Sequence, residues 1–149
     1  MRVVIQRVLR AEVTAAGEVV GSIDSGLLVY VGVGKGDGAG DVAYTADKLV
    51  GLRIFADEAG KMNLSVRDVG GGILVVSNFT LYGDCRKGRR PSFDESAGAE
   101  QARELYSGFL ESIKVKGVGV AGGEFGEYMQ VKSVNDGPVT FFLDSRVSG

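Results

Sequence analysis

The sequence contains no histidine, and this absence excludes the most common catalytic arrangements. Ser-His-Asp and Cys-His catalysis both need an imidazole, and so do many metal sites. The single cysteine, Cys85, cannot form a disulfide within the chain or a zinc site built from cysteines alone, and it favours a reducing compartment. We therefore expect no metal and no cofactor. An enzyme of this composition would use hydroxyls, carboxylates, backbone groups or the substrate itself.

Long apolar runs and a strong excess of charge are also missing. No run approaches the ~18 apolar residues that span a bilayer, and Arg2 brings charge too early for a secretion signal. The net charge of −2 excludes a polycation that binds nucleic acid through its overall charge. We expect a soluble cytoplasmic protein without a membrane partner. Only 2 prolines accompany 24 glycines, which lack the G-X-Y period of collagen.

The length of 149 residues fits a single domain over residues 1–149. Runs rich in β-branched residues predict strands at residues 3–13, 19–23, 27–31, 52–55, 73–80, 118–121, 128–134 and 139–143. Apolar residues at helical spacing predict helices at residues 42–50, with Asp41 as the N-cap, and at 99–113. The short turns between the first strands favour antiparallel pairing. The predicted class is α+β, with a mostly antiparallel sheet and two main helices.

A glycine-rich loop covers residues 32–40, after a predicted strand and before a helix. Gly34, Gly36 and Ala39 match the weak form of the dinucleotide-binding pattern. The strands before it look antiparallel, and no phosphate-binding Lys-Ser pair follows Gly36. We therefore favour a flexible connector over a nucleotide site.

Three further segments each fit two interpretations when only the spacing of their residues is considered. Residues 77–80 place Ser, Asn and Thr where a buried strand ends, so their side chains and backbone N–H groups either bind a ligand or satisfy local backbone groups. Residues 86–90 hold four of the 17 basic residues, which suits either an anion site or a solvated loop. Residues 135–138 (Asn-Asp-Gly-Pro) form either a plain turn or a shaped site, since a Gly-Pro bond adopts the cis form at modest cost.

Together, residues 77–82 (SNFTLY) and 135–140 (NDGPVT) resemble the two signature motifs of the D-aminoacyl-tRNA deacylases. The similarity extends to residues 5–8, 60–65, 87–93 and 125–129. These blocks occur in order over nearly the whole chain, and their joint occurrence is specific. The resemblance implies the fold of that family, with a barrel-like sheet.

The resemblance also implies a homodimeric hydrolase with its active sites at the subunit interface. Its substrate would be D-aminoacyl-tRNA, cleaved at the ester to the terminal adenosine. Gly137 and Pro138, joined by a cis bond, would form a chiral filter whose main-chain carbonyls exclude L side chains from the partner's pocket. Arg7 would support that loop. Glycine has no side chain to exclude, so glycyl-tRNA mischarged on alanine tRNA is an implied further substrate.

For the reaction itself, the resemblance points to residues 77–80. Thr80 is the family's candidate nucleophile, but no base is available to deprotonate its hydroxyl. We therefore favour Thr80 and Phe79 as backbone N–H donors, Ser77 as a positioning group, and the ribose 2′-hydroxyl of the substrate as the group that helps to activate water.

The remaining roles concern binding of the tRNA end. The resemblance assigns substrate contacts to Asn78, Phe125 and Met129, and contacts with acceptor-stem phosphates to the basic residues Arg86, Lys87, Arg89 and Arg90. Asn78 stands where the family usually has Gln, and residues 127–128 (Glu-Tyr) replace a smaller, less charged pair. The alternative function is a non-catalytic tRNA- or RNA-binding module that uses the basic loop and the sheet surface.

Overall fold

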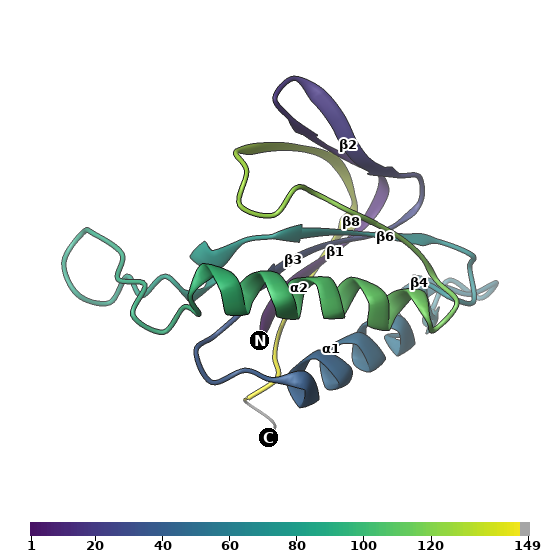
Figure 1. Ribbon diagram of the computed structural model, residues 1–149. Helices are drawn as coiled ribbons and strands as arrows, with labels where there is room; N and C mark the ends of the chain where they lie inside the picture. The colour runs from purple at the N-terminus through teal and green to yellow at the C-terminus, as the bar shows by residue number, and fades with distance from the viewer. Residues whose placement is uncertain (147–149) are drawn as a thin grey trace.

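A six-stranded sheet with two helices packed on it dominates the computed structural model, which describes residues 1–146 (Figure 1). The strands of this sheet are β1 (Arg2–Ala15), β2 (Glu18–Ile23), β3 (Gly26–Gly32), β6 (Gly72–Ser77), β7 (Gly119–Gly122) and β8 (Met129–Asp144). A separate ribbon contains β4 (Phe55–Ala56) and β5 (Met62–Leu64). The helices are α1 (Ala39–Gly51), α2 (Ala99–Lys114) and the short 3-10 helix η1 (Phe79–Tyr82). The predicted α+β class with two main helices is confirmed.

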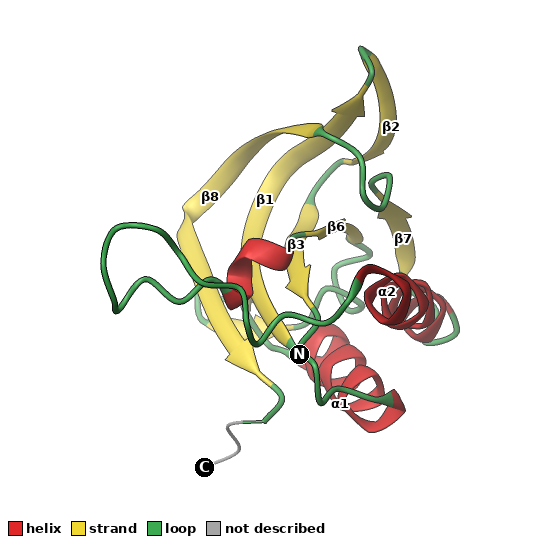
Figure 2. Ribbon diagram, turned by 60° about the vertical axis from the view of Figure 1, so that its left-hand side comes forward, coloured by secondary structure: helices red, strands yellow, loops and turns green. Residues whose placement is uncertain are grey.

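The long strand β1 organises the sheet. It runs antiparallel to three strands: its first half lies between β3 and β8, and its second half lies between β2 and β8. The sheet therefore curls into an incomplete barrel, as Figure 2 shows. The predicted antiparallel pairing of the first strands is confirmed. Two parallel pairings, β3 with β6 and β6 with β7, were not predicted, and the connections containing α1 and α2 make them possible.

The two central strands are buried on both faces because their side chains alternate between two hydrophobic clusters. Val29 in β3 and Val75 in β6 pack toward the helices, in the same cluster as Phe109 of α2. Leu28 and Leu74 point to the opposite face, into the space enclosed by β1, β2 and β8. This two-residue period explains why continuous apolar runs form these strands.

Both predicted main helices form, but the start of α1 differs from the prediction. Gly38 is the N-cap, and Asp41 lies inside the first turn rather than at the N-cap. The Asp41 carboxylate accepts a hydrogen bond from the Gly38 amide at 2.9 Å, so it still satisfies a donor at the helix start. Within residues 1–146, no helix is long and apolar enough to cross a membrane.

The predicted strand at residues 52–55 is largely wrong. Leu52 instead closes α1, because its amide donates to the Lys48 carbonyl at 3.0 Å. Only Phe55 from this segment enters a strand, where it pairs with Leu64 of β5.

At the ends of the longer strands, two boundaries also differ from the sequence analysis. The strand predicted at residues 73–80 ends at Ser77, because Asn78 caps η1. The two strands predicted at residues 128–134 and 139–143 are one strand, β8, with irregular pairing where it passes Val8 of β1.

The glycine-rich loop at residues 32–40 is a packed connector between β3 and α1. The Gly34 amide donates to the Asp37 carboxylate at 2.7 Å, and that carboxylate lies 2.6 Å from the Met1 amine. A Cβ on Gly34 would lie 2.8 Å from the Tyr82 ring. The small residues of the loop therefore serve close packing, so the loop is a connector as predicted but is packed rather than flexible.

Gly26, at the start of β3, offers a test of the parallel pairing. We expect Gly26→Ala to lower the free energy of unfolding by about 3 kcal/mol, because the added Cβ would overlap the Gly72 carbonyl of β6. Gly108→Ala, in a part of α2 with open space around the added atom, should raise it by about 0.5–1 kcal/mol. Urea denaturation at one fixed protein concentration measures both. Equal effects of the two changes would contradict this account.

Candidate active site

A cavity of about 360 Å³ opens where β3 and β6 end. Because these strands are parallel, with Val31 paired to Ser77, their carboxyl ends lie at the same edge of the sheet. This is the edge at which open α/β sheets bind ligands. The cavity lining includes five of the predicted site residues, namely Ser77, Asn78, Phe79, Phe125 and Met129. Another cavity, of about 340 Å³, lies between β2 and β8 and contains none of the predicted site residues.

The turn from β6 into η1 shapes the mouth of this cavity. The Asn78 side-chain oxygen accepts hydrogen bonds from the Thr80 amide, at 3.2 Å, and from the Thr80 hydroxyl. Both polar donors of Thr80 are thus engaged within the turn. The Phe79 amide donates no hydrogen bond to any of the described residues. Of the two backbone donors predicted here, only the Phe79 N–H is free to bind a ligand in this structure.

An Asn two residues before a Thr is a typical helix-capping pattern. This signal is present in the sequence, and it supports the alternative in which Thr80 serves local structure. Thr80 is exposed and does not line the cavity, whereas the half-buried Ser77 does.

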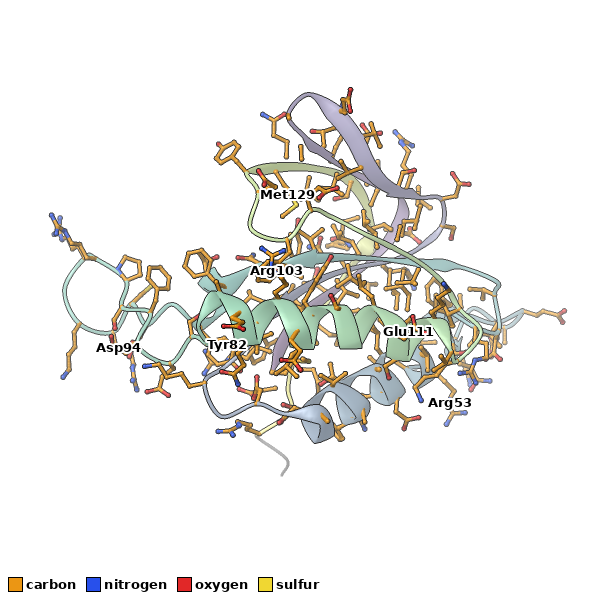
Figure 3. All side chains as sticks on the ribbon, in the orientation of Figure 1. Arg53, Tyr82, Asp94, Arg103, Glu111 and Met129 are labelled. Carbon is orange, nitrogen blue, oxygen red and sulfur yellow. The ribbon has the colours of Figure 1, made fainter. Side chains whose placement is uncertain are left out.

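The opposite wall of the cavity is aromatic and apolar. The Phe125 ring lies 5.7 Å from the Tyr106 ring, centroid to centroid, and the Arg103 guanidinium stands over it at 4.7 Å. Figure 3 shows Arg103 rising from α2 toward the segment that leads to Met129. Burial raises the pKa of Tyr106 to about 12, so its hydroxyl stays protonated while it donates to the Val75 carbonyl. Small alanines of the 96–102 segment leave the cavity open between these walls.

Sequence reasoning missed Arg103. It lies on the polar side of an amphipathic helix, where arginine is ordinary, and no spacing pattern relates it to Phe125. Only the packing of α2 against the segment before β8 brings the two together.

The basic loop at residues 86–90 projects from the end of the molecule at which α2 begins (Figure 1). Its base is closed by two backbone hydrogen bonds between Asp84 and Ser92, at 2.7 and 2.9 Å. Arg86 binds the Asp84 carboxylate at 2.7 Å, and this contact lowers the pKa of that carboxyl to about 2. The other three cations of the loop, Lys87, Arg89 and Arg90, are exposed and have no salt bridge within residues 1–146.

The Gly137–Pro138 segment lies far from this cavity in the same chain. Its peptide bond is cis. Arg7, which lies beside it on β1, forms an ion pair with Asp136 at 3.2 Å and donates to the Ile54 carbonyl at 2.8 Å. Since β8 pairs with β1, the strand β1 lies between this segment and β3, at whose end the cavity opens, and β8 itself lines the cavity only at its first residue, Met129.

The Asn135 side chain braces the same segment. Its amide donates to the Arg7 carbonyl at 2.9 Å and to the Val139 carbonyl at 3.1 Å. Within residues 1–146, no group of three or more His, Cys, Asp or Glu side chains is placed to hold a metal ion.

Comparison with known proteins agrees with this geometry. The model of the family described as D-Tyr-tRNA(Tyr) deacylase matches residues 4–144. The chain is 59% identical over 146 residues to a D-aminoacyl-tRNA deacylase of Syntrophobacter fumaroxidans, covering 98% of both chains. It is 57% identical to one of Thermosipho africanus, again covering 98% of both.

Two solved structures have the same fold. The c-Myc DNA Unwinding Element Binding Protein is 40% identical, with a TM-score of 0.92 over 97% of this chain and 98% of that one. A probable eukaryotic D-amino acid tRNA deacylase is 18% identical, with a TM-score of 0.82 over 95% and 97% of the two chains, a likeness of fold alone. By sequence over nearly its full length, the chain belongs to the D-aminoacyl-tRNA deacylase family of hydrolases.

Proposed function

We propose that this protein hydrolyses the ester that joins a D-amino acid to the terminal adenosine of tRNA, releasing the free amino acid and the tRNA. The observation that carries the proposal is the unpaired Phe79 amide at the mouth of a cavity with an apolar, aromatic wall. Such a cavity suits a nucleoside, and a backbone N–H that is fixed in place suits the oxyanion of ester hydrolysis. Membership of the deacylase family supports the same reaction.

The mechanism needs no strong base, because an aminoacyl ester is already activated. Water attacks the ester carbonyl, and the Phe79 amide stabilises the negative charge that develops on its oxygen. The adjacent ribose hydroxyl takes the proton from water and passes it to the departing ribose oxygen as the ester bond breaks. Ser77, which lines the cavity, positions the substrate. This route agrees with a chain that contains no histidine.

The apolar wall provides the place for the terminal adenosine. Phe125 and Met129 contact the base, and the Asn78 side chain lies at the same mouth as the reacting ester. The basic loop extends binding to the acceptor stem through Lys87 and the two arginines that follow it, whose charges are free for phosphates. We infer a cytoplasmic location, since aminoacyl-tRNA is made and used there.

Rejection of L-amino acids requires a surface that blocks one position around the Cα. The carbonyls of Gly137 and Pro138 suit this task, because steric rejection of one hand works for every side chain. Glycine passes such a filter, so glycyl-tRNA mischarged on alanine tRNA is a further proposed substrate. Within one chain the strand β1 lies between the segment and β3, at whose end the cavity opens, so the filter must come from a second copy.

Exposed aromatic residues support a homodimer. Phe141 and Phe142 on β8, and Phe79 beside the cavity, expose 42%, 61% and 57% of their surface in the single chain. Because successive side chains of a strand point to opposite faces, the rings of Phe141 and Phe142 expose apolar surface on both faces of β8, and exposed apolar surface commonly marks a protein interface. Sedimentation equilibrium should give twice the chain mass of 15.6 kDa. A mass of one chain at assay concentration would contradict the filter supplied by a second copy.

The direct test is hydrolysis of matched substrates by the purified protein. We expect release of D-tyrosine from D-Tyr-tRNA and no release of L-tyrosine from L-Tyr-tRNA above the uncatalysed rate. Retention of tRNA binding without release from either substrate would favour the alternative, a non-catalytic RNA-binding module.

A second prediction distinguishes the contribution of the Phe79 amide to catalysis from the contributions of the Phe79 ring and of Thr80. Phe79→Pro removes the N–H at the first helical position, which accepts proline, while Phe79→Ala keeps it. We expect kcat of Phe79→Pro to be about 100-fold below that of Phe79→Ala. Thr80→Ala should keep kcat within about ten-fold of the wild type, since its hydroxyl is bound to Asn78.

The measurement is single-turnover deacylation of D-Tyr-tRNA at saturating enzyme, with circular dichroism to confirm folding. If Thr80→Ala abolishes turnover while substrate affinity is unchanged, the hydroxyl is catalytic and the assignment to the Phe79 amide is wrong.

A further inference from the structure

An aromatic pair lies between the cavity and the basic loop. The Phe79 and Phe93 rings meet edge to face, with centroids 5.1 Å apart and planes at 63°. Phe79 also lines the cavity, whereas Phe93 directly follows the Ser92 pairing that closes the basic loop. The two rings therefore connect the cavity to the three free cations.

The Phe93 ring is held in place although it is partly open to water. The residue exposes 38% of its surface, and its backbone is fixed by a hydrogen bond that its carbonyl accepts from the Ser96 amide at 3.0 Å. The ring lies against Gly83, where an added Cβ would come within 3.1 Å of it. A fixed, partly exposed ring offers a stacking surface at little further cost in side-chain entropy.

The charge around the pair favours RNA over an apolar partner. Exposed aromatic rings beside lysines and arginines are typical of surfaces that bind unpaired nucleotides, because bases stack on the rings while phosphates meet the cations. Lys87, Arg89 and Arg90 have no salt bridge within the described chain, so their charges are free to neutralise phosphates.

We propose that Phe93, together with Phe79, forms a stacking platform for the unpaired nucleotides that precede the terminal adenosine of tRNA. This inference rests on the proposed function, which places the adenosine against Phe125 and the acceptor stem near the basic loop. The aromatic pair offers an RNA strand a path between those two places, because Phe79 lines the cavity and Phe93 follows the base of the basic loop. Phe93 is then a positioning residue, which acts on whole tRNA and does not touch the reacting ester.

The test compares whole tRNA with the smallest substrate, adenosine esterified with D-tyrosine. Phe93→Leu keeps an apolar side chain but removes the ring face, so we expect kcat/KM for D-Tyr-tRNA to fall about ten-fold. For the adenosine ester we expect less than about a two-fold change, because that substrate has no preceding nucleotide. Phe93→Tyr keeps the ring and should match the wild type on both substrates.

Two results would overturn the proposal. An unchanged kcat/KM of Phe93→Leu on tRNA would show that the ring contacts no nucleotide. An equal loss on both substrates would show that Phe93 only holds Phe79 in place. The mass of Phe93→Leu, measured by sedimentation, should equal that of the wild type, and a lower mass would assign the residue to a protein interface instead.

A binding experiment decides the question without catalysis. We expect wild-type affinity for uncharged tRNA to drop when the unpaired 3′ nucleotides are removed, at one fixed salt concentration. Phe93→Leu should lose less affinity than the wild type on the same truncation, because it still loses the contacts of the terminal adenosine with Phe125 and Met129 but has no stacking on Phe93 to lose. If the wild type hydrolyses neither substrate, the proposed function fails, while this comparison still tests the stacking platform. If the wild type and Phe93→Leu lose the same affinity when the 3′ nucleotides of the tRNA are removed, the stacking platform is refuted.

Discussion

The parallel pairing of β3 with β6 is the constraint on which the site depends. It brings the carboxyl ends of two buried strands to one edge of the sheet, with Val31 beside Ser77. The cavity lies at that edge, and η1 begins there. Parallel neighbours need long connections, and α1 and α2 fill those connections while they cover one face of the sheet. The same arrangement thus forms the core and positions the site.

At this edge, the short turn from β6 into η1 contains polar groups that stabilise the turn and one group that is available to a ligand. Asn78 binds both donors of Thr80, whereas the Phe79 amide has no hydrogen-bond partner among residues 1–146. In the proposed reaction, that amide stabilises the oxyanion, and the substrate's own hydroxyl does the work that a histidine does in many hydrolases. The histidine-free composition is consistent with such a backbone site.

In the single chain, the segment proposed as the chiral filter does not lie at the cavity. Arg7 and Asn135 brace the segment at residues 136–138 through an ion pair and side-chain hydrogen bonds, on the far side of β1. The cavity opens at the end of β3, on the other side of β1. The proposed homodimer brings them together, and it gives the exposed Phe141 and Phe142 a partner surface.

The sequence by itself determined the local features. The 99–113 helix, the buried central strands and the antiparallel pairing of the first strands follow from periodicity and short turns, and the joint motifs by themselves indicate the family. Tertiary structure decided the parallel pairings and the approach of Arg103 to Phe125 and of Phe93 to Phe79. Local sequence patterns report which face of an element is buried. They do not report which distant element covers it, and that choice depends on how the whole sheet curls and packs.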